Sequence, residues 1–403
     1  MTIQGLAAFL KAKCPKAFER FDDTRLMMAR FAGKTVVCDL AGYMHKYAYI
    51  HQDARTGTTN WPQVHESLLQ MYTAFRDFEV TLVFIFDGTY AAQAKRGEHI
   101  SRGKQRDVLK HKVMQHNSAV EADLADSEAA AKRRRVDDTD VKPSGADGLT
   151  LDERIAKMSE DLSTNGYSLT PTEPAAAAAA TAVPPKTSTF VKHPVTVGGA
   201  QYRDAQRFFL KNRVPFYNAV GEGKHLGALL VRSTMPQFSH IAALLSDDLD
   251  SVACGALITI RFWRSGKQPL ELIHLDRVLS TLRLTYSQLV DMCVLCGSDF
   301  SSKLPGVGPA AALKLVQIWQ SLDRIAAQPT LALQGLRHPA THETASSAWP
   351  QFDFRTARAL LHGGDDTAAG STVATIDPRA WIKPTSAFAL IETLVTDRLL
   401  ARR

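Results

Sequence analysis

The sequence contains no apolar run long enough to span a membrane, and it is poor in cysteine. Its 403 residues include five cysteines, Cys14, Cys38, Cys254, Cys293 and Cys296. An odd number of cysteines, mostly inside apolar runs, argues for reduced thiols in an intracellular protein. The opening residues MTIQGLAAFLKAKCP show no signal-peptide pattern. We therefore expect neither secretion nor membrane insertion.

The pair Cys293-x-x-Cys296 has the spacing of half a zinc or redox site, but the chain holds no second pair of this kind. It lies within an apolar helical pattern, so core packing is favoured over metal binding.

The charge balance is only moderately basic, with a net charge of +7 and a pI of about 9.1. Such a balance favours an anionic partner and suggests nucleic acid without demonstrating it. Hydrophobic residues make up 45% of the chain, which is enough for a sizeable core, and the length suggests two or three domains.

Acidic residues follow several apolar runs. The run at 241–245 leads into Asp248 and Asp250, which share a face if the segment is extended. Runs at 34–39, 81–87 and 214–222 end in Asp39, Asp87 and Glu222. Apolar runs of this kind are typical of central parallel strands, whose carboxyl ends form ligand sites. Converging carboxylates suit Mg²⁺, whereas each acid taken alone could be a helix cap or a turn residue.

The remaining pattern predicts helices over 1–33, 40–49, 61–75, 204–211, 223–230, 352–362 and 386–403, and strands over 258–263 and 270–275. The aromatic residues of 40–49 fit ordinary core packing, and some could stack on unpaired bases.

A basic stretch at 94–106 contains Lys95 and Arg102, seven residues apart and so on one helical face. It is either a solvated surface or a pair of cations reaching towards a phosphate. From 115 to 195 the composition predicts a low-complexity, disordered insert. Its KRRRV run at 132–136 fits nuclear import, DNA contact or a basic loop.

A second functional segment runs from Leu284 to Val316. An apolar helix is followed by Gly297-Ser-Asp299, then by Gly306-Val307-Gly308-Pro309 and another helix. The two glycines allow close approach of a ligand, and Pro309 suits the first helical position. Amides at that helix start could hold a phosphate.

These motifs, in this order and spacing, resemble the flap endonucleases and their XPG-like structure-specific 5′ nuclease relatives, over about 1–105 and 200–325. The resemblance is carried by the opening residues, the strand ends at Asp39 and Phe84-Ile-Phe-Asp87-Gly88, the pair Lys95 and Arg102, and Gly221-Glu222. The resemblance also includes three later motifs: Ser246-Asp-Asp248-Leu-Asp250, Gly297-Ser-Asp299-Phe300 and Gly306-Val-Gly308-Pro309. A divergent, large-DNA-virus type of member is compatible with it.

The resemblance implies a Mg²⁺-dependent nuclease, a flap endonuclease or exonuclease, that cuts DNA at flaps or single-strand/duplex junctions in replication, repair or recombination. The resemblance implies two Mg²⁺ ions, or a single ion because Lys224 replaces one acid, and Mn²⁺ could substitute for Mg²⁺. The implied metal ligands are Asp39, Asp87, Glu222, Asp248, Asp250 and Asp299. Lys95 and Arg102 would act on the scissile phosphate. Gly306, Val307, Gly308 and Pro309 would hold duplex backbone.

Three positions depart from the family pattern. Lys224 stands where the family has a second glutamate, Thr2 where it has a glycine, and His45 where it has a base-stacking tyrosine.

We find no sliding-clamp motif near the C-terminus. We expect a monomer that acts in the nucleus or at another intracellular site of DNA replication. The rival hypothesis is a non-catalytic module that binds branched DNA, because of Lys224.

The expected fold is α/β: a mostly parallel central sheet flanked by helices, like the PIN-like 5′ nuclease fold. Residues 1–114 and 196–280 would form the nuclease domain, 115–195 the insert, 281–330 a helix–two-turn–helix DNA-binding segment, and 331–403 a helical extension.

Overall fold

The computed structural model describes Ile3 and residues 5–88, 96–137, 190–264, 268–298 and 301–362. Within 96–137 it describes side chains over 106–126. The chain divides into two compact units, Met1–Lys110 with Lys192–Arg403, and His111–Val191. No helix in the described part is long and apolar enough to cross a membrane.

Within the described residues, seven strands form one sheet in the order β1-β7-β6-β5-β2-β3-β4. Neighbouring strands from β6 to β4 run parallel, and β7 and β1 add an antiparallel edge. The strands are β1 (Phe18–Phe21), β2 (Thr35–Asp39), β3 (Thr81–Phe86), β4 (Phe216–Asn218), β5 (Ile241–Leu245), β6 (Ile258–Arg261) and β7 (Leu270–His274). The expected mostly parallel central sheet is confirmed.

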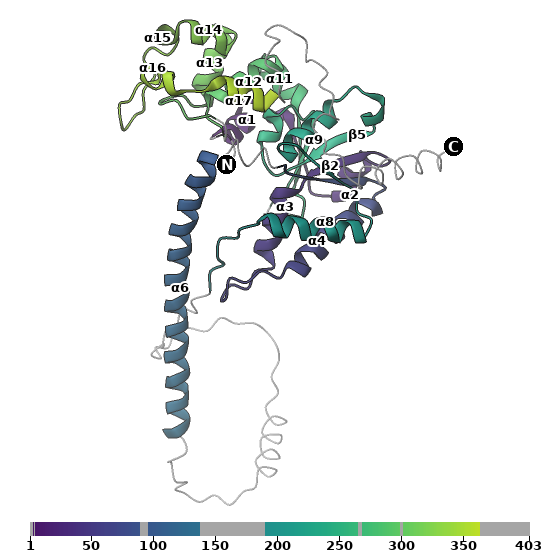
Figure 1. Ribbon diagram of the computed structural model, residues 1–403, viewed down its shortest axis with the longest axis vertical. Helices are drawn as coiled ribbons and strands as arrows, with labels where there is room; N and C mark the ends of the chain where they lie inside the picture. Colours follow the sequence, from purple (N-terminus) through teal and green to yellow (C-terminus); the bar gives the residue numbers. More distant parts are fainter. Residues whose placement is uncertain are drawn as a thin grey trace, which may run out of the picture. The chain divides into compact units, whose positions relative to one another are not determined.

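Alternate residues of the central strands face opposite helical layers, because successive side chains of a strand point to opposite faces. Val37 and Ile85 belong to one hydrophobic cluster, and Val36 and Phe84 to the other. Figure 1 shows α3, α4 and α8 on one side of β2 and β5, and α9 and α12 on the other.

The first layer, with Val37, contains α1 (Leu6–Lys13), α9 (Gly223–Arg232), α10 (Asp250–Ala253), α11 (Leu275–Leu282), α12 (Tyr286–Leu295), α13 (Pro309–Trp319), α14 (Leu322–Ala327) and α17 (Phe354–His362). The second contains α2 (Thr24–Ala29), α3 (Leu40–Ile50), α4 (Trp61–Asp77) and α8 (Gly199–Lys211). Apart from α6 (Arg96–Asp137), the remaining described elements are the short helices α15 (Pro329–Ala332) and α16 (Ala345–Ala348) and the 3₁₀ turns η1 (Pro15–Ala17), η2 (Pro236–Phe238) and η3 (Trp349–Gln351).

Two segments differ from the sequence-based expectation. Residues 1–33 are not wholly helical, because Phe18–Phe21 forms β1 at the sheet edge and pairs with β7. The predicted insert at 115–195 is helical at its start, since α6 (Arg96–Asp137) continues to Asp137. Alanine, glutamate, lysine and arginine favour a helix even where no apolar face forms. Residues 138–189 of that insert lie outside the described residues.

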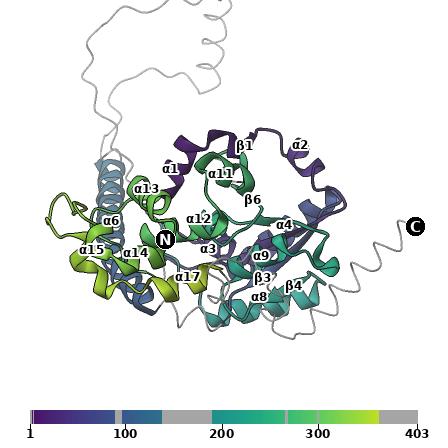
Figure 2. The ribbon, with the colours of Figure 1, turned by 90° about the horizontal axis from the view of Figure 1, so that it is seen from above.

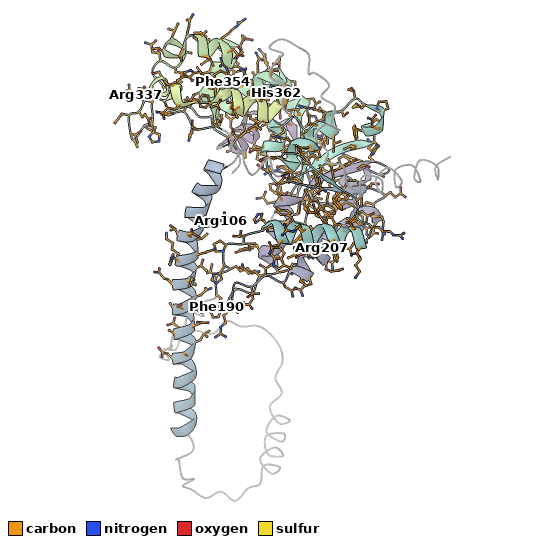
Figure 3. The ribbon with its side chains drawn as sticks, viewed as in Figure 1. Arg106, Phe190, Arg207, Arg337, Phe354 and His362 are labelled. Carbon is orange, nitrogen blue, oxygen red and sulfur yellow. The ribbon has the colours of Figure 1, made fainter. Side chains whose placement is uncertain are left out.

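Helices near the C-terminal end of the described chain pack on α12. In Figure 2, α13 and α17 lie beside α12, α14 lies beside α13, and α15 lies beside α14. Phe354 and His362, labelled in Figure 3, stand at the two ends of α17. Cys293 and Cys296 are buried in this core, as expected of packing residues.

A buried ion pair joins three of these helices. Arg358 of α17 donates to both carboxylate oxygens of Asp291 on α12, at 2.8 and 3.2 Å, and to Asp323 of α14 at 2.8 Å. The Leu322 amide donates to the same Asp291 carboxylate at 2.9 Å. Bidentate geometry of this kind is specific in direction, so it sets how α14 and α17 meet α12.

Replacement of Arg358 by Met would leave the buried Asp291 carboxylate without its cation. We expect Arg358→Met to lower the free energy of unfolding by about 3–5 kcal/mol, measured by urea denaturation. Arg355→Met, an exposed arginine on the same helix, is the matched control and should change little. A loss of less than about 1 kcal/mol in Arg358→Met would contradict the role given to this pair.

Candidate metal and phosphate site

The predicted acids converge because their strands are neighbours in the sheet. Asp39 ends β2, and Asp87 directly follows β3. Glu222 is the N-cap of α9, after β4, while Asp248 and Asp250 follow β5. The order β5-β2-β3-β4 puts the carboxyl ends of these four parallel strands at one edge. We call these five residues the acid cluster; the sixth predicted ligand, Asp299, lies outside the described residues.

Ser246 connects two strands that carry acids. Its hydroxyl donates to Asp39 Oδ2 at 3.1 Å, and it accepts from the Asp248 amide at 3.3 Å. The side chain is fully enclosed between β2 and the turn after β5. Sequence reasoning missed Ser246 as a positioning residue, although it begins the Ser-Asp-Asp run that was singled out.

Asp87 is held by the start of α9. The Gly223 amide donates to Asp87 Oδ1 at 2.7 Å. A helix N-terminus attracts negative charge, so this position favours an ionised carboxylate. The loops after β3 and β4 also touch directly, because the Gly88 amide donates to the Gly221 carbonyl at 2.6 Å.

Lys224 lies inside the acid cluster and is 5% exposed. Its Nζ donates to Asp248 Oδ2 at 3.0 Å, and it lies 3.5 Å from both Glu222 Oε2 and Asp250 Oδ2. Three of the five described acids therefore surround one ammonium group.

The charges divide the cluster into two parts. Burial, followed by the negative charge of Asp87, raises the pKa of Asp39 to about 7, and Lys224 offsets only part of that rise. Burial would also raise the pKa of Asp248, but the nearby Lys224 ammonium lowers it below its ordinary value. Burial opposes the charge on Lys224, whereas Asp248, Glu222 and Asp250 together raise its pKa well above normal. The Lys224 ammonium thus offsets part of the negative charge of the three acids around it, whereas the pKa of Asp39 stays raised.

Two neighbours support the cluster without belonging to it. The Ile3 amide donates to Asp250 Oδ1 at 2.9 Å, so the N-terminal segment is tied to α10. Asp247 is an anchor: its carboxylate accepts from the Phe262 amide at 2.7 Å, and its carbonyl accepts from Arg261 at 3.0 and 3.2 Å. Of the three aspartates after β5, Asp247 is therefore tied to β6, whereas Asp248 and Asp250 contact Lys224.

The structure places the other predicted site residues as follows. Lys95 lies outside the described residues, and Arg102 lies on α6 with its side chain undescribed. His45 is exposed on α3. Gly306, Val307, Gly308 and Pro309 form the turn into α13: Val307 is buried, and Pro309 is the first residue of the helix.

The glycines of this turn have different surroundings. Gly306 has φ +73°, and a Cβ there would come within 2.4 Å of the Arg337 carbonyl oxygen. Gly308, the N-cap of α13, has φ −109° and nothing within 4 Å of a Cβ. The fold itself requires glycine at 306, whereas no described neighbour requires it at 308.

Among the described residues, no group of three or more His, Cys, Asp or Glu side chains has the geometry to hold a metal ion. The Lys224 ammonium gives a physical reason, because it already holds Glu222, Asp248 and Asp250.

Comparisons with known proteins give sequence matches that include several of these residues. Residues 213–299 match the XPG I-region family, a span that contains Glu222, Lys224, Asp248 and Asp250. Flap endonuclease 1 of Aspergillus clavatus is 33% identical over 159 residues, 39% of this chain and 37% of that protein. Flap endonuclease 1-2 of Paramecium tetraurelia is 24% identical over 335 residues, 81% of this chain and 67% of that protein.

These sequence matches show that the chain is similar to the XPG I-region over residues 213–299 and to flap endonucleases over part of their length. The matches to the Aspergillus clavatus and Ajellomyces dermatitidis proteins span 37% and 40% of those relatives' lengths. The solved flap endonuclease-1 from Methanococcus jannaschii aligns at 13% identity with a TM-score of 0.46, over 94% of this chain and 90% of that one. At this identity and TM-score, the fold is described from the sheet order of this chain alone.

Gly88 tests how closely the acid-bearing loops must approach. A Cβ there would lie 2.0 Å from the Val220 carbonyl oxygen. We expect Gly88→Ala to lower the free energy of unfolding by about 3 kcal/mol or more, because backbone would have to move. Gly42→Ala, in the open helical surface of α3, should instead stabilise by about 0.5–1 kcal/mol. Equal effects of the two substitutions in thermal denaturation would contradict the close approach.

Proposed function

We propose that this protein is a metal-dependent, structure-specific 5′ nuclease that hydrolyses DNA phosphodiester bonds at flaps or single-strand/duplex junctions. The observation that carries the proposal is the acid cluster, in which carboxylates from four strand ends meet at one edge and three belong to the XPG I-region match. The proposed setting is the nucleus or another intracellular site of DNA replication. The proposed acting form is a monomer, since one chain supplies the whole cluster.

The donors fit a divalent cation on one side of the cluster. Asp39 and Asp87 offer carboxylate oxygens, which Mg²⁺ and Mn²⁺ favour. Burial, followed by the negative charge of Asp87, raises the pKa of Asp39, and a bound cation would offset both effects. Asp299 is a further proposed ligand. Bound there, a divalent cation supplies positive charge to a phosphate oxygen and lowers the pKa of a neighbouring water molecule.

The chain's own residues prepare this side for a ligand. Ser246 and the Gly223 amide orient the two carboxylates from separate elements, so neither depends on a flexible loop alone. Lys95 and Arg102 are proposed to stabilise negative charge on the scissile phosphate. Exposed His45 is proposed to stack on an unpaired base.

The turn before α13 is proposed to hold duplex backbone. The start of α13 presents amides, which suit a phosphate, and Gly308 leaves space above them. Contacts of this type position DNA and do not read its sequence.

Cleavage of a 5′-labelled flap duplex with Mg²⁺ or Mn²⁺ tests the proposed activity. The parent should cut near the junction, and Asp39→Asn should lower the rate by roughly 10²–10³-fold, because several kcal/mol of charge stabilisation are lost. Asp276→Asn, an exposed aspartate on α11, is the control for charge and should cut like the parent. One long product would indicate an endonuclease, and mononucleotides an exonuclease.

A parent protein that binds flap, nicked and gapped duplexes without cutting any of them would contradict the nuclease. It would favour the non-catalytic module instead, whose affinity for junctions should not depend on metal.

Gly308 allows a separate test of duplex binding. We expect Gly308→Leu to weaken binding of a flap duplex about tenfold or more, with Gly308→Ala intermediate and the melting temperature unchanged, because only a ligand occupies that space. Affinity is measured in EDTA to prevent cutting, with a single-stranded oligonucleotide as the reference. Unchanged duplex affinity in Gly308→Leu would remove the turn from the DNA interface.

A further inference from the structure

Lys224 occupies an unusual position for a positive charge. It lies in the first turn of α9, where the helix dipole disfavours a cation, and it is almost completely buried. A buried ammonium group is stable only when it is paired and hydrogen-bonded. The three carboxylates within 3.5 Å of Nζ provide that pairing.

The same three carboxylates leave no room for a second cation of higher charge while the ammonium stays in place. Mg²⁺ binds carboxylate oxygens at about 2.0–2.1 Å and demands a near-octahedral set of ligands. An ion held by Asp248 Oδ2 together with Glu222 or Asp250 would have to take the space where Nζ lies. These three acids therefore do not fit a divalent ion as they are arranged.

The other side of the cluster is different. The ion pairs of Lys224 are with Glu222, Asp248 and Asp250, and Asp39 and Asp87 are instead oriented by Ser246 and the Gly223 amide. The Ser246 hydroxyl is a donor without full charge, so it orients the Asp39 carboxylate while leaving its negative charge available to a cation.

We propose that the Lys224 ammonium is a permanent cation of this site, which takes the place of one of two divalent ions, so that the site binds a single divalent ion on the Asp39 side of the cluster. This inference rests on the proposed function, since it concerns the same site. Lys224 is then a positioning residue: it keeps Glu222, Asp248 and Asp250 together in the absence of metal.

The test counts ions directly. Full-length, metal-free protein without DNA is titrated with Mn²⁺, and the free ion is followed by electron paramagnetic resonance. We expect one bound Mn²⁺ per parent chain and two per Lys224→Glu chain. Lys34→Glu makes the same charge change at an exposed residue before the amino end of β2, the opposite edge of the sheet, and should bind one.

Lys224→Glu could fail to fold, because it adds a fourth carboxylate where a cation is lost. Lys224→Met keeps the length of the side chain and adds no new charge. It should also bind two ions, and Mn²⁺ should raise its melting temperature more than that of the parent. Two ions in the parent, none in the parent, or one in both folded Lys224 variants would each overturn the proposal.

The count of ions is independent of DNA cleavage. A parent that binds one Mn²⁺ but leaves every flap uncut would contradict the proposed function alone. A parent that cuts flaps while binding two ions would contradict the role of Lys224 alone.

Discussion

Repulsion among carboxylates is the constraint on which the rest of this structure depends. Five acids lie at the ends of four neighbouring strands, and the sheet holds them together whether or not their charge is balanced. Lys224 offsets part of the charge on one side, where Glu222, Asp248 and Asp250 surround its ammonium group. On the other side, burial and then the negative charge of Asp87 raise the pKa of Asp39 to about 7. A cluster in which an ammonium group already lies among three of the five acids fits one divalent ion better than two.

The fold brings these charges together through close contacts of loops. Gly88 meets the loop after β4, the Gly223 amide holds Asp87, and Ser246 joins β2 to the turn after β5. Asp247 anchors that turn to β6 and so leaves Asp248 and Asp250 to face the cluster. The helices packed on α12 include α13, whose first turn is proposed to hold duplex backbone, and Arg358 with Asp291 joins α17 to α12.

Much of the site could be predicted from the sequence, because apolar runs that end in acids mark the carboxyl ends of parallel strands. The runs ending at Asp39 and Asp87 were recognised in this way, and both are strands of the central sheet. β1 was missed because Phe18–Phe21 is short and owes its strand conformation to pairing with β7. The helical start of the insert was missed because α6 has no apolar face of its own. The partners of Lys224 could not be derived, since side-chain direction depends on how α9 meets β5.

The most direct measurement is an anomalous diffraction map from crystals of the full-length protein soaked in Mn²⁺. The account predicts one strong peak at coordination distance, about 2.1–2.3 Å, from Asp39 and Asp87, with Lys224 still among the other three acids. A peak enclosed by Glu222, Asp248 and Asp250, with the lysine turned away, would contradict it.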